Sequence, residues 1–261
     1  MIEDVIANVV ASYPSEITRH HNFDNPRTTW QVQTVLNARG KDPSSVSICD
    51  IGGGLSTFPR VLAAMNCARV VLVDDFRDSW HHLHTKEVLS GHERVGIEVY
   101  SRDVLESGIS DLGNFDVITS FDSMEHWHNS PKNVFHQVMD CLLPGGVFFL
   151  GVPNCVNLRK RLSTPFGYNK WSTMAYWYEE PVFRAHVREP DVDDLLYIAK
   201  DMNLTDVHIF GRNWIGHRHP KRIIRVATSL VDKMLSQFPT LCSDIYLLGK
   251  KSYSTQSIFQ R

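Results

Sequence analysis

Short apolar runs alternate with segments of helical periodicity along most of the chain. The runs are rich in β-branched and aromatic residues, which is typical of strands that are buried on both faces. They predict strands at 46–51, 68–73, 95–100, 115–121, 147–152, 206–210 and 243–249. The intervening segments predict helices at 58–65, 81–89, 131–143, 191–202 and 222–235.

This alternation predicts an α/β fold. Strands separated by helices are joined by right-handed crossovers, so we expect a Rossmann-like, mostly parallel sheet with helices on both faces. The rhythm breaks after Pro153, and we interpret the aromatic and basic stretch that follows as a substrate-cover insertion. We expect a single domain over 1–261, divided into an N-terminal helical cap (1–45), a core (46–152), the insertion (153–190) and a C-terminal helix with strands (191–261).

Composition and charge narrow the class of protein. The formal net charge of −2 gives no overall attraction to nucleic acid or to an anionic membrane. No apolar run approaches the roughly 18 residues of a membrane span, and the start at Met1 lacks the pattern of a signal peptide. The five cysteines are scattered and form no C-x-x-C pair, as expected in a reducing cytoplasm. We therefore expect a cytoplasmic protein with no nucleic-acid or membrane partner, and we keep a homodimer open.

The glycine-rich segment Asp50-Ile51-Gly52-Gly53-Gly54-Leu55-Ser56-Thr57 follows the first predicted strand. A strand, a glycine turn and a helix N-terminus together form a site for a nucleotide-like ligand. The third glycine of a dinucleotide fingerprint is replaced by Thr57. Asp50 is also poorly placed for a pyrophosphate, but it suits the ammonium of S-adenosylmethionine (SAM). The loop thus favours SAM over NAD, and an NAD-dependent oxidoreductase remains the rival class of enzyme.

Asp50, Asp74 and Asp103 lie at or just after the ends of three successive predicted strands. Asp74 lies twenty residues after Gly54, where it can accept both ribose hydroxyls, with Asp75 as the alternative acceptor. Asp103 follows the third strand and can accept from the adenine amino group. A single aspartate of this kind is as often a helix N-cap, so it is the ordered set that predicts an adenosine site.

With these residues in place, 46–154 resembles the class I SAM-dependent methyltransferases, especially the type 11 and type 23 group related to ubiquinone and menaquinone C-methylases. The resemblance is carried by the cofactor loop at 50–54, the fourth strand with its Glu-His turn at 115–126, and the Pro-Gly-Gly turn with the fifth strand at 142–154. Ser56 departs from the pattern, since many members have a further glycine there. The resemblance implies a seven-stranded sheet with an antiparallel last strand. A second stretch, 183–189, is similar to a His-Val-Arg-Glu segment of bacterial members.

The resemblance also implies a role for each cofactor-binding residue. The methionine part of SAM is expected against the loop, the ribose on Asp74, and the adenine against Asp103 and Val104. Phe121 and Asp122 are expected to form the floor beneath the sulfonium. The loop residues expected to line the methionine part are Asp50, Gly52, Gly53 and Gly54.

Two histidines are candidate catalytic bases, because histidine titrates near neutral pH. His126 follows the fourth strand and His186 lies in the insertion. Each has a structural alternative: His126 can orient the following helix, and His186 can anchor the cover. Glu125 is a base or a helix N-terminal acid.

The sequence predicts no functional metal. Three local histidine clusters lack the i, i+4 spacing that places two ligands on one helical face. They are His81-His82-x-His84, His126-x-His128 and His217-x-His219.

The expected activity is transfer of a methyl group from SAM to an oxygen or nitrogen atom of a small molecule, such as a saccharide or a secondary metabolite. A quinone-type C-methyltransferase and a non-catalytic SAM-binding protein remain open. Basic stretches at 159–161 and 218–225 line an acceptor pocket or form solvated faces. Aromatic residues of the insertion line that pocket or pack the cover onto the domain; they are Tyr168, Trp171, Tyr176 and Trp177.

Overall fold

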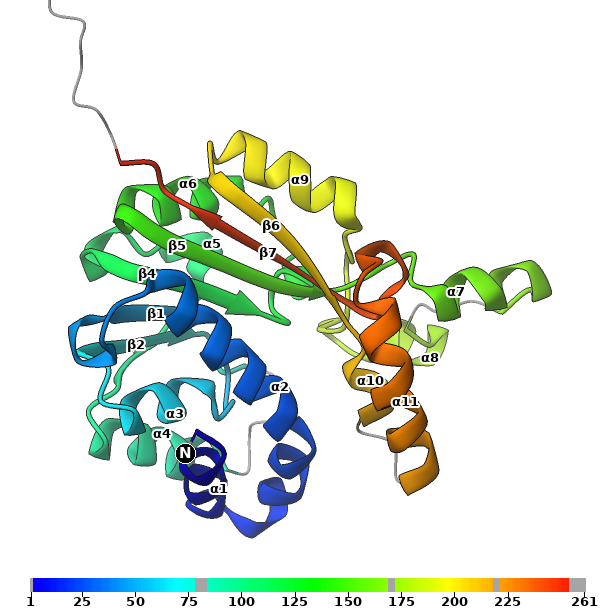
Figure 1. Cartoon of the computed structure of the whole chain (residues 1–261), viewed down its shortest axis with the longest axis horizontal. Coiled ribbons are helices and arrows are strands. Elements are labelled where there is room, and N and C mark those ends of the chain that lie inside the picture. Colours follow the sequence, from blue (N-terminus) through cyan, green and yellow to red (C-terminus); the bar gives the residue numbers. More distant parts are fainter. Residues whose placement is uncertain (1, 78–83, 169–171, 218–220, 254–261) are drawn as a thin grey trace, which may run out of the picture.

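A computed structural model describes residues 2–77, 84–168, 172–217 and 221–253. These residues form one sheet with helices on both faces (Figure 1). The strands are β1 (Ser47–Ile51), β2 (Arg69–Asp74), β3 (Glu98–Ser101), β4 (Phe115–Phe121), β5 (Leu142–Pro153), β6 (Thr205–Arg212) and β7 (Asp244–Lys250). The helices are α1 (Ile2–Ala11), α2 (Ser15–Arg39), α3 (Phe58–Ala64), α4 (Thr85–Arg94), α5 (Val104–Ser107), α6 (Lys132–Cys141), α7 (Leu158–Ser163), α8 (Met174–Glu179), α9 (Val192–Asp201), α10 (Trp214–His217) and α11 (Arg222–Leu235).

The sheet has seven strands in the order β3-β2-β1-β4-β5-β7-β6. The strands from β3 to β5 pair in parallel, whereas β7 pairs antiparallel with both β5 and β6. The predicted fold class is confirmed, including the antiparallel last strand. The order reverses direction at β1 and β4, and ligands of α/β proteins bind beyond the carboxyl ends of strands at such a point.

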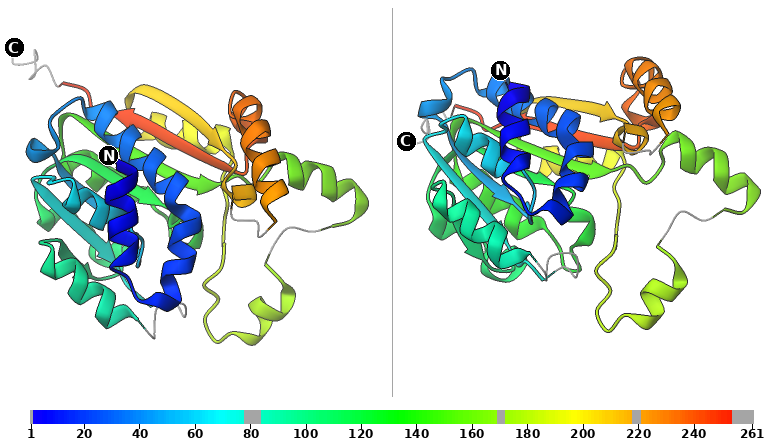
Figure 2. Two further views of the ribbon diagram at one scale, coloured as in Figure 1. Left: turned by 60° about the horizontal axis from the view of Figure 1, so that its bottom comes forward. Right: turned by 90° about the horizontal axis from the view of Figure 1, so that it is seen from below.

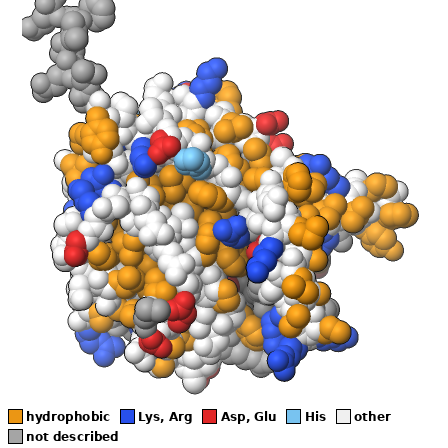
Figure 3. All heavy atoms as spheres, in the orientation of Figure 1, with side chains coloured by type: hydrophobic (Ala, Val, Ile, Leu, Met, Phe, Trp, Pro, Cys, Tyr) orange, Lys and Arg blue, Asp and Glu red, His pale blue; other side chains and the backbone are white. Residues whose placement is uncertain are grey.

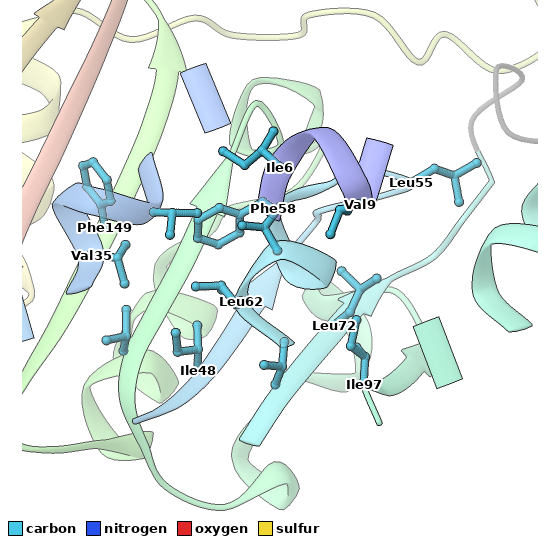
Figure 4. Packing of buried hydrophobic residues seen from close by; sticks show 14 of the residues in the cluster. Ile6, Val9, Val35, Ile48, Leu55, Phe58, Leu62, Leu72, Ile97 and Phe149 are labelled. Carbon is cyan, nitrogen blue, oxygen red and sulfur yellow. The ribbon is translucent and has the colours of Figure 1, made fainter. Parts of the chain in front are cut away.

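Alternate residues of each strand supply two hydrophobic cores, one on each face of the sheet. Ile48 faces a core built with α1, α2 and α3, in which Ile6, Phe58 and Phe149 are buried (Figure 4). The adjacent Cys49 faces the second core, built with α6 and α9. The continuous apolar runs of the sequence are therefore strands covered on both sides, as expected for a parallel sheet.

The N-terminal helices pack on the sheet and supply residues to the first core. At the end of α2, the Arg39 guanidinium donates two hydrogen bonds to Asp116 Oδ1 at the start of β4, over 2.9 and 2.8 Å. Lys41 donates to the same oxygen over 2.7 Å, and the backbone N–H of Ser47 donates to Oδ2. Burial would raise the pKa of Asp116, but these hydrogen bonds bring it below its ordinary value. Of the helices within the described ranges, none is both long and apolar enough to cross a bilayer.

Several predicted boundaries were wrong by a few residues. Strand β3 begins at Glu98 instead of Val95, because α4 continues to Arg94 and Gly96 turns the chain at a φ of +82°. Helix α6 ends at Cys141, and Leu142 already pairs with Phe115, so the Pro-Gly-Gly turn lies inside β5 at an irregularity of the ladder. The predicted helix at 81–89 is found as α4, although 81–83 lie outside the described residues.

The insertion at 153–190 leaves the carboxyl end of β5, and its helices α7 and α8 project beyond the sheet (Figure 2). Neither helix has a buried residue. Hydrophobic side chains are exposed over the insertion and the neighbouring α11 (Figure 3), among them Leu162, Phe166 and Met234. The part after α8 returns to the sheet, where the backbone N–H of Val187 donates to Glu125 O over 2.6 Å.

Candidate active site

A cleft of about 180 Å³ lies at the carboxyl ends of the parallel strands, where the order of the sheet reverses. Four parallel strands contribute residues that end or directly follow them, so the chain brings distant residues to one edge. Among the residues that line the cleft are Gly52, Asp74, Asp75, Asp103, Val104, Asp122, His126 and Arg184.

The glycine loop requires its glycines for two different reasons. Gly52 has a φ of +72°, and a Cβ there would lie 1.8 Å from Ser123 Oγ. Gly53 has no room for a side chain because a Cβ would lie 2.1 Å from Asp50 Oδ2. The backbone N–H of Gly54 donates to Asp74 Oδ2 over 2.9 Å, which ties the loop to the end of β2. The loop backbone therefore lies close against both carboxylates.

Asp50 is a buried carboxyl group at the start of this loop, with 1% of its surface exposed. Thr119 Oγ1 on β4 donates to Asp50 Oδ1 over 2.6 Å. The pKa of Asp50 is raised to about 7, mainly by burial; the hydrogen bond from Thr119 lowers it in part, and the nearby Asp74 adds to the increase. A cationic ligand beside Asp50 would favour the ionised form.

The remaining predicted carboxylates line the cleft, and each also has a hydrogen-bond partner in the protein. Asp74 Oδ1 accepts from the backbone N–H of Phe76 over 2.6 Å. Asp75 forms an ion pair of 3.2 Å with Arg184 of the insertion. Asp103 caps α5 by accepting from the N–H of Leu105 over 2.8 Å, and the next residue, Val104, is buried. The N-cap alternative for Asp103 thus holds together with its position in the cleft.

A second cavity, of about 150 Å³, lies on the other side of the glycine loop, under α2. Phe121 and Asp122 both line it, and Asp122 lines the first cleft as well. Asp122 has an unusual backbone φ of +49° and forms an ion pair with the buried Arg27 of α2. Arg27 Nε also donates to the hydroxyl of Tyr246 over 3.2 Å. Arg27 could not be predicted from the sequence, because one arginine within a polar helix has no distinctive pattern.

The structure brings both candidate bases together with Glu125. The rings of His126 and His186 meet edge to face, with centroids 4.9 Å apart. His126 Nδ1 lies 2.7 Å from the carbonyl oxygen of Arg184, and His186 Nδ1 lies 2.7 Å from Glu189 Oε1. His186 Nε2 lies 4.0 Å from Glu125 Oε1. These histidines lie in separate segments of the sequence, and they come into contact because the insertion returns to the sheet after α8.

Glu125 is 1% exposed, and its Oε2 has no hydrogen-bond partner among the described residues. Burial, with Asp122 nearby, raises the pKa of Glu125 well above its ordinary value. Burial would also raise the pKa of Glu189, but hydrogen bonds from His186 and Lys160 bring it below its ordinary value. The surroundings therefore favour the neutral form of Glu125 and the ionised form of Glu189, although both approach the same histidine.

Other candidate residues lie at the edge of this site or outside the described residues. His128 Nε2 lies 2.9 Å from the carbonyl oxygen of Phe183 on the exposed side of the cleft. In the basic stretch at 159–161, Lys160 forms an ion pair with Glu189. The predicted residues that cannot be placed are His81, His82, Trp171, 218–220 and the side chain of His217.

Comparisons with known proteins agree with this geometry. The sequence profile of a family described as "Methyltransferase domain" matches residues 19–209, whereas no curated protein matches the sequence. Among solved structures, a putative sarcosine dimethylglycine methyltransferase from Galdieria sulphuraria is similar, with a TM-score of 0.58, 15% identity and coverage of 92% of each chain.

Two further solved structures have the same fold. A SAM-dependent methyltransferase from Archaeoglobus fulgidus matches with a TM-score of 0.52 and 15% identity, over 85% of this chain and 93% of its own. Magnesium protoporphyrin IX methyltransferase from Synechocystis, solved with bound S-adenosylhomocysteine (SAH), matches with a TM-score of 0.53 and 14% identity, over 90% of this chain and 84% of its own. The chain therefore belongs to the methyltransferase domain family and has the fold of SAM-dependent methyltransferases.

Proposed function

We propose that this protein transfers a methyl group from SAM to an oxygen or nitrogen atom of a small molecule. The observation that supports it most directly is the glycine loop, whose backbone lies against the buried carboxyl group of Asp50 and against Asp74. A carboxylate at Asp50 complements the ammonium of the methionine part of SAM, and a pyrophosphate would be repelled there. Membership of the methyltransferase domain family favours the same reading over an NAD-dependent oxidoreductase.

The cofactor is assigned to the two cavities that meet at Asp122. Its methionine part lies against Asp50 and Gly52–Gly54, its ribose on Asp74, and its adenine against Asp103 and Val104. Phe121 and Asp122 then form the floor beneath the sulfonium. Because Asp75 is paired with Arg184, we assign the ribose to Asp74.

The acceptor approaches from the side of the insertion, where Arg184 and His126 line the cleft. Methyl transfer is an in-line displacement, so the site must hold the nucleophile and the methyl carbon in line and shield them from water. His126, which lines the cleft and contacts His186 edge to face, can assist loss of a proton from a hydroxyl or amine.

The test begins with cofactor binding. Thermal unfolding is measured with SAM, SAH and NAD, and SAM and SAH are expected to raise the midpoint. Stabilisation by NAD alone would contradict the proposal. A screen with methyl-labelled SAM over fractionated metabolites then tests catalysis. Tight SAM binding with no labelled product in any fraction would favour a non-catalytic SAM-binding protein.

A further inference from the structure

Three side chains with metal-ligating atoms converge at the edge of the cofactor cleft. The ligand atoms of Glu125, His126 and His186 all lie within 4.8 Å of one another. They come from two separate segments: the turn after β4 carries Glu125 and His126, and the returning insertion carries His186, sixty residues later. We propose that these three residues bind a divalent transition-metal ion, with zinc as the representative case.

The protonation pattern of both imidazoles supports this proposal. The partner of His126 Nδ1 is the carbonyl oxygen of Arg184, which can only accept a hydrogen bond. The partner of His186 Nδ1 is the Glu189 carboxylate. In the neutral form each ring therefore carries its proton on Nδ1 and its lone pair on Nε2. Metal-ligating histidines usually show this arrangement, in which a carbonyl or carboxylate holds the N–H opposite the metal.

The surroundings of the Glu125 carboxyl group are a second, independent observation in favour of a metal site. Glu125 Oε2 is buried and has no hydrogen-bond partner among the described residues. Asp122 and Glu189 add negative charge around it, which Arg27 offsets in part. A buried carboxylate without a partner is costly, and a divalent cation held between it and two imidazoles would compensate its charge.

The ligand set indicates the class of ion. Two imidazoles and one carboxylate leave coordination positions open, as in catalytic zinc sites and in facial triads. Bonds of about 2.1 Å hold ligand atoms roughly 3 to 3.5 Å apart. His186 Nε2 and Glu125 Oε1, now 4.0 Å apart, need to approach each other only slightly.

The role of the ion, unlike its binding, rests on the proposed function. His126 lines the cofactor cleft, so an open coordination position lies beside it. An acceptor hydroxyl bound there would lose its proton to water more readily. Its oxygen would then form the new O–CH₃ bond as the S–CH₃ bond breaks, and the sulfonium would keep the electron pair of that bond and become the neutral thioether. The histidines would then act through the ion and not as bases, and the acceptor atom would be oxygen.

Binding is tested with Co²⁺ on the full chain after chelator treatment. One Co²⁺ per chain, with visible absorption bands displaced by Zn²⁺ and unaffected by an equal concentration of Mg²⁺, is the expected result. His186→Ala should weaken Co²⁺ binding by at least about 100-fold, because even the loss of an outer partner typically weakens metal binding 10- to 100-fold. His128→Ala is the matched control, since His128 also contacts the insertion backbone but lies outside the cluster; its Co²⁺ spectrum should not change.

Glu189→Gln is a milder second variant, for which we expect about tenfold weaker Co²⁺ binding. The proposed metal site would be contradicted if the wild-type chain bound neither Co²⁺ nor Zn²⁺. It would also be contradicted if His186→Ala bound Co²⁺ with wild-type affinity. Methyl transfer that is lost on chelation and restored by Zn²⁺ supports the role, and transfer unaffected by complete chelation overturns it. Failure of SAM binding while Co²⁺ binding persists would instead contradict the proposed function.

Discussion

At the scale of single residues, the positions at strand ends could be predicted from the sequence and their partners could not. Asp50, Asp74 and Asp103 each follow an apolar run, and parallel strands bring such positions to one edge of the sheet. Arg27 reaches Asp122 across ninety-five positions of sequence, and no local pattern indicates such a contact. The cluster of Glu125, His126 and His186 was missed as a set for the same reason, since its members are joined only by the path of the insertion.

Asp74→Ala is expected to weaken SAM binding by about 1 to 3 kcal/mol, because a ribose hydroxyl would lose its acceptor. Isothermal titration of SAM measures the change. Asp75→Ala is the matched control and should retain the wild-type affinity, since Asp75 is paired with Arg184. Weaker SAM binding by Asp75→Ala, with unchanged binding by Asp74→Ala, would instead show that Asp75 binds the ribose.

The pKa of Asp50, about 7, predicts a pH-dependent affinity for SAM. The ammonium of SAM favours the ionised carboxyl group, so the affinity should rise about tenfold between pH 6 and pH 8. Titration of SAM at several pH values should show this slope for the wild-type chain and for Asp103→Asn, but not for Asp50→Asn. An equal slope in Asp50→Asn would assign the dependence to another group.

The stability of the ligand-free protein is expected to change with pH in the opposite direction to the SAM affinity. The pKa of Asp50 in the folded protein lies above its ordinary value of 3.8. Its contribution to the free energy of unfolding of the ligand-free protein is therefore fully present below about pH 4 and is lost as the pH rises through 7.

At the scale of elements, periodicity identified each strand of the sheet, and the errors lie at ends where tertiary pairing overrides local pattern. The Pro-Gly-Gly turn was expected to separate a helix from a strand, but pairing of Leu142 with Phe115 starts β5 before the turn. The hydrogen bonds of Asp116 with Arg39, Lys41 and Ser47, here called the Asp116 cluster, could not be predicted from the sequence either. These residues contact Asp116 only after α2 packs on the sheet.

Asp116→Ala is expected to lower the free energy of unfolding by about 3 kcal/mol, because it leaves the buried Arg39 without its carboxylate. Urea denaturation measures the loss. Asp201→Ala is the control, since its ion pair with Lys132 is exposed and should contribute less than about 1 kcal/mol. Equal losses in the two variants would show that the Asp116 cluster adds no more than a surface pair.

At the scale of the whole molecule, the sheet and its two cores form the main body, and the insertion projects from one end of it (Figure 2). Its function as a substrate cover remains a prediction from the sequence. Among its described residues, Val182 and Arg184, which follow α8, line the cleft. Trp177 on α8 is 57% exposed. Exposed aromatic residues on a projecting segment contribute little to folding and are available to contact a ligand.

Trp177→Ala is therefore expected to change the free energy of unfolding by less than about 0.5 kcal/mol and to leave SAM affinity unchanged. If the insertion covers the acceptor, the KM for the acceptor should rise several-fold. Tyr197→Ala on α9 removes an aromatic ring that is 73% exposed and lies outside the insertion, so it serves as the control. An unchanged KM for Trp177→Ala would show that Trp177 on α8 does not contribute to acceptor binding.

The position of β7 between β5 and β6 has a consequence for biosynthesis. Strand β6 is synthesised before β7 and joins the sheet through it, because β7 is the partner of β6 among the described strands. During synthesis on the ribosome, β6 therefore lacks the strand with which it pairs until Asp244–Lys250 emerges. Over the same period, β5 has an unpaired apolar edge. A nascent chain stalled before β7 should consequently be the species most prone to aggregation and the one that most needs a chaperone.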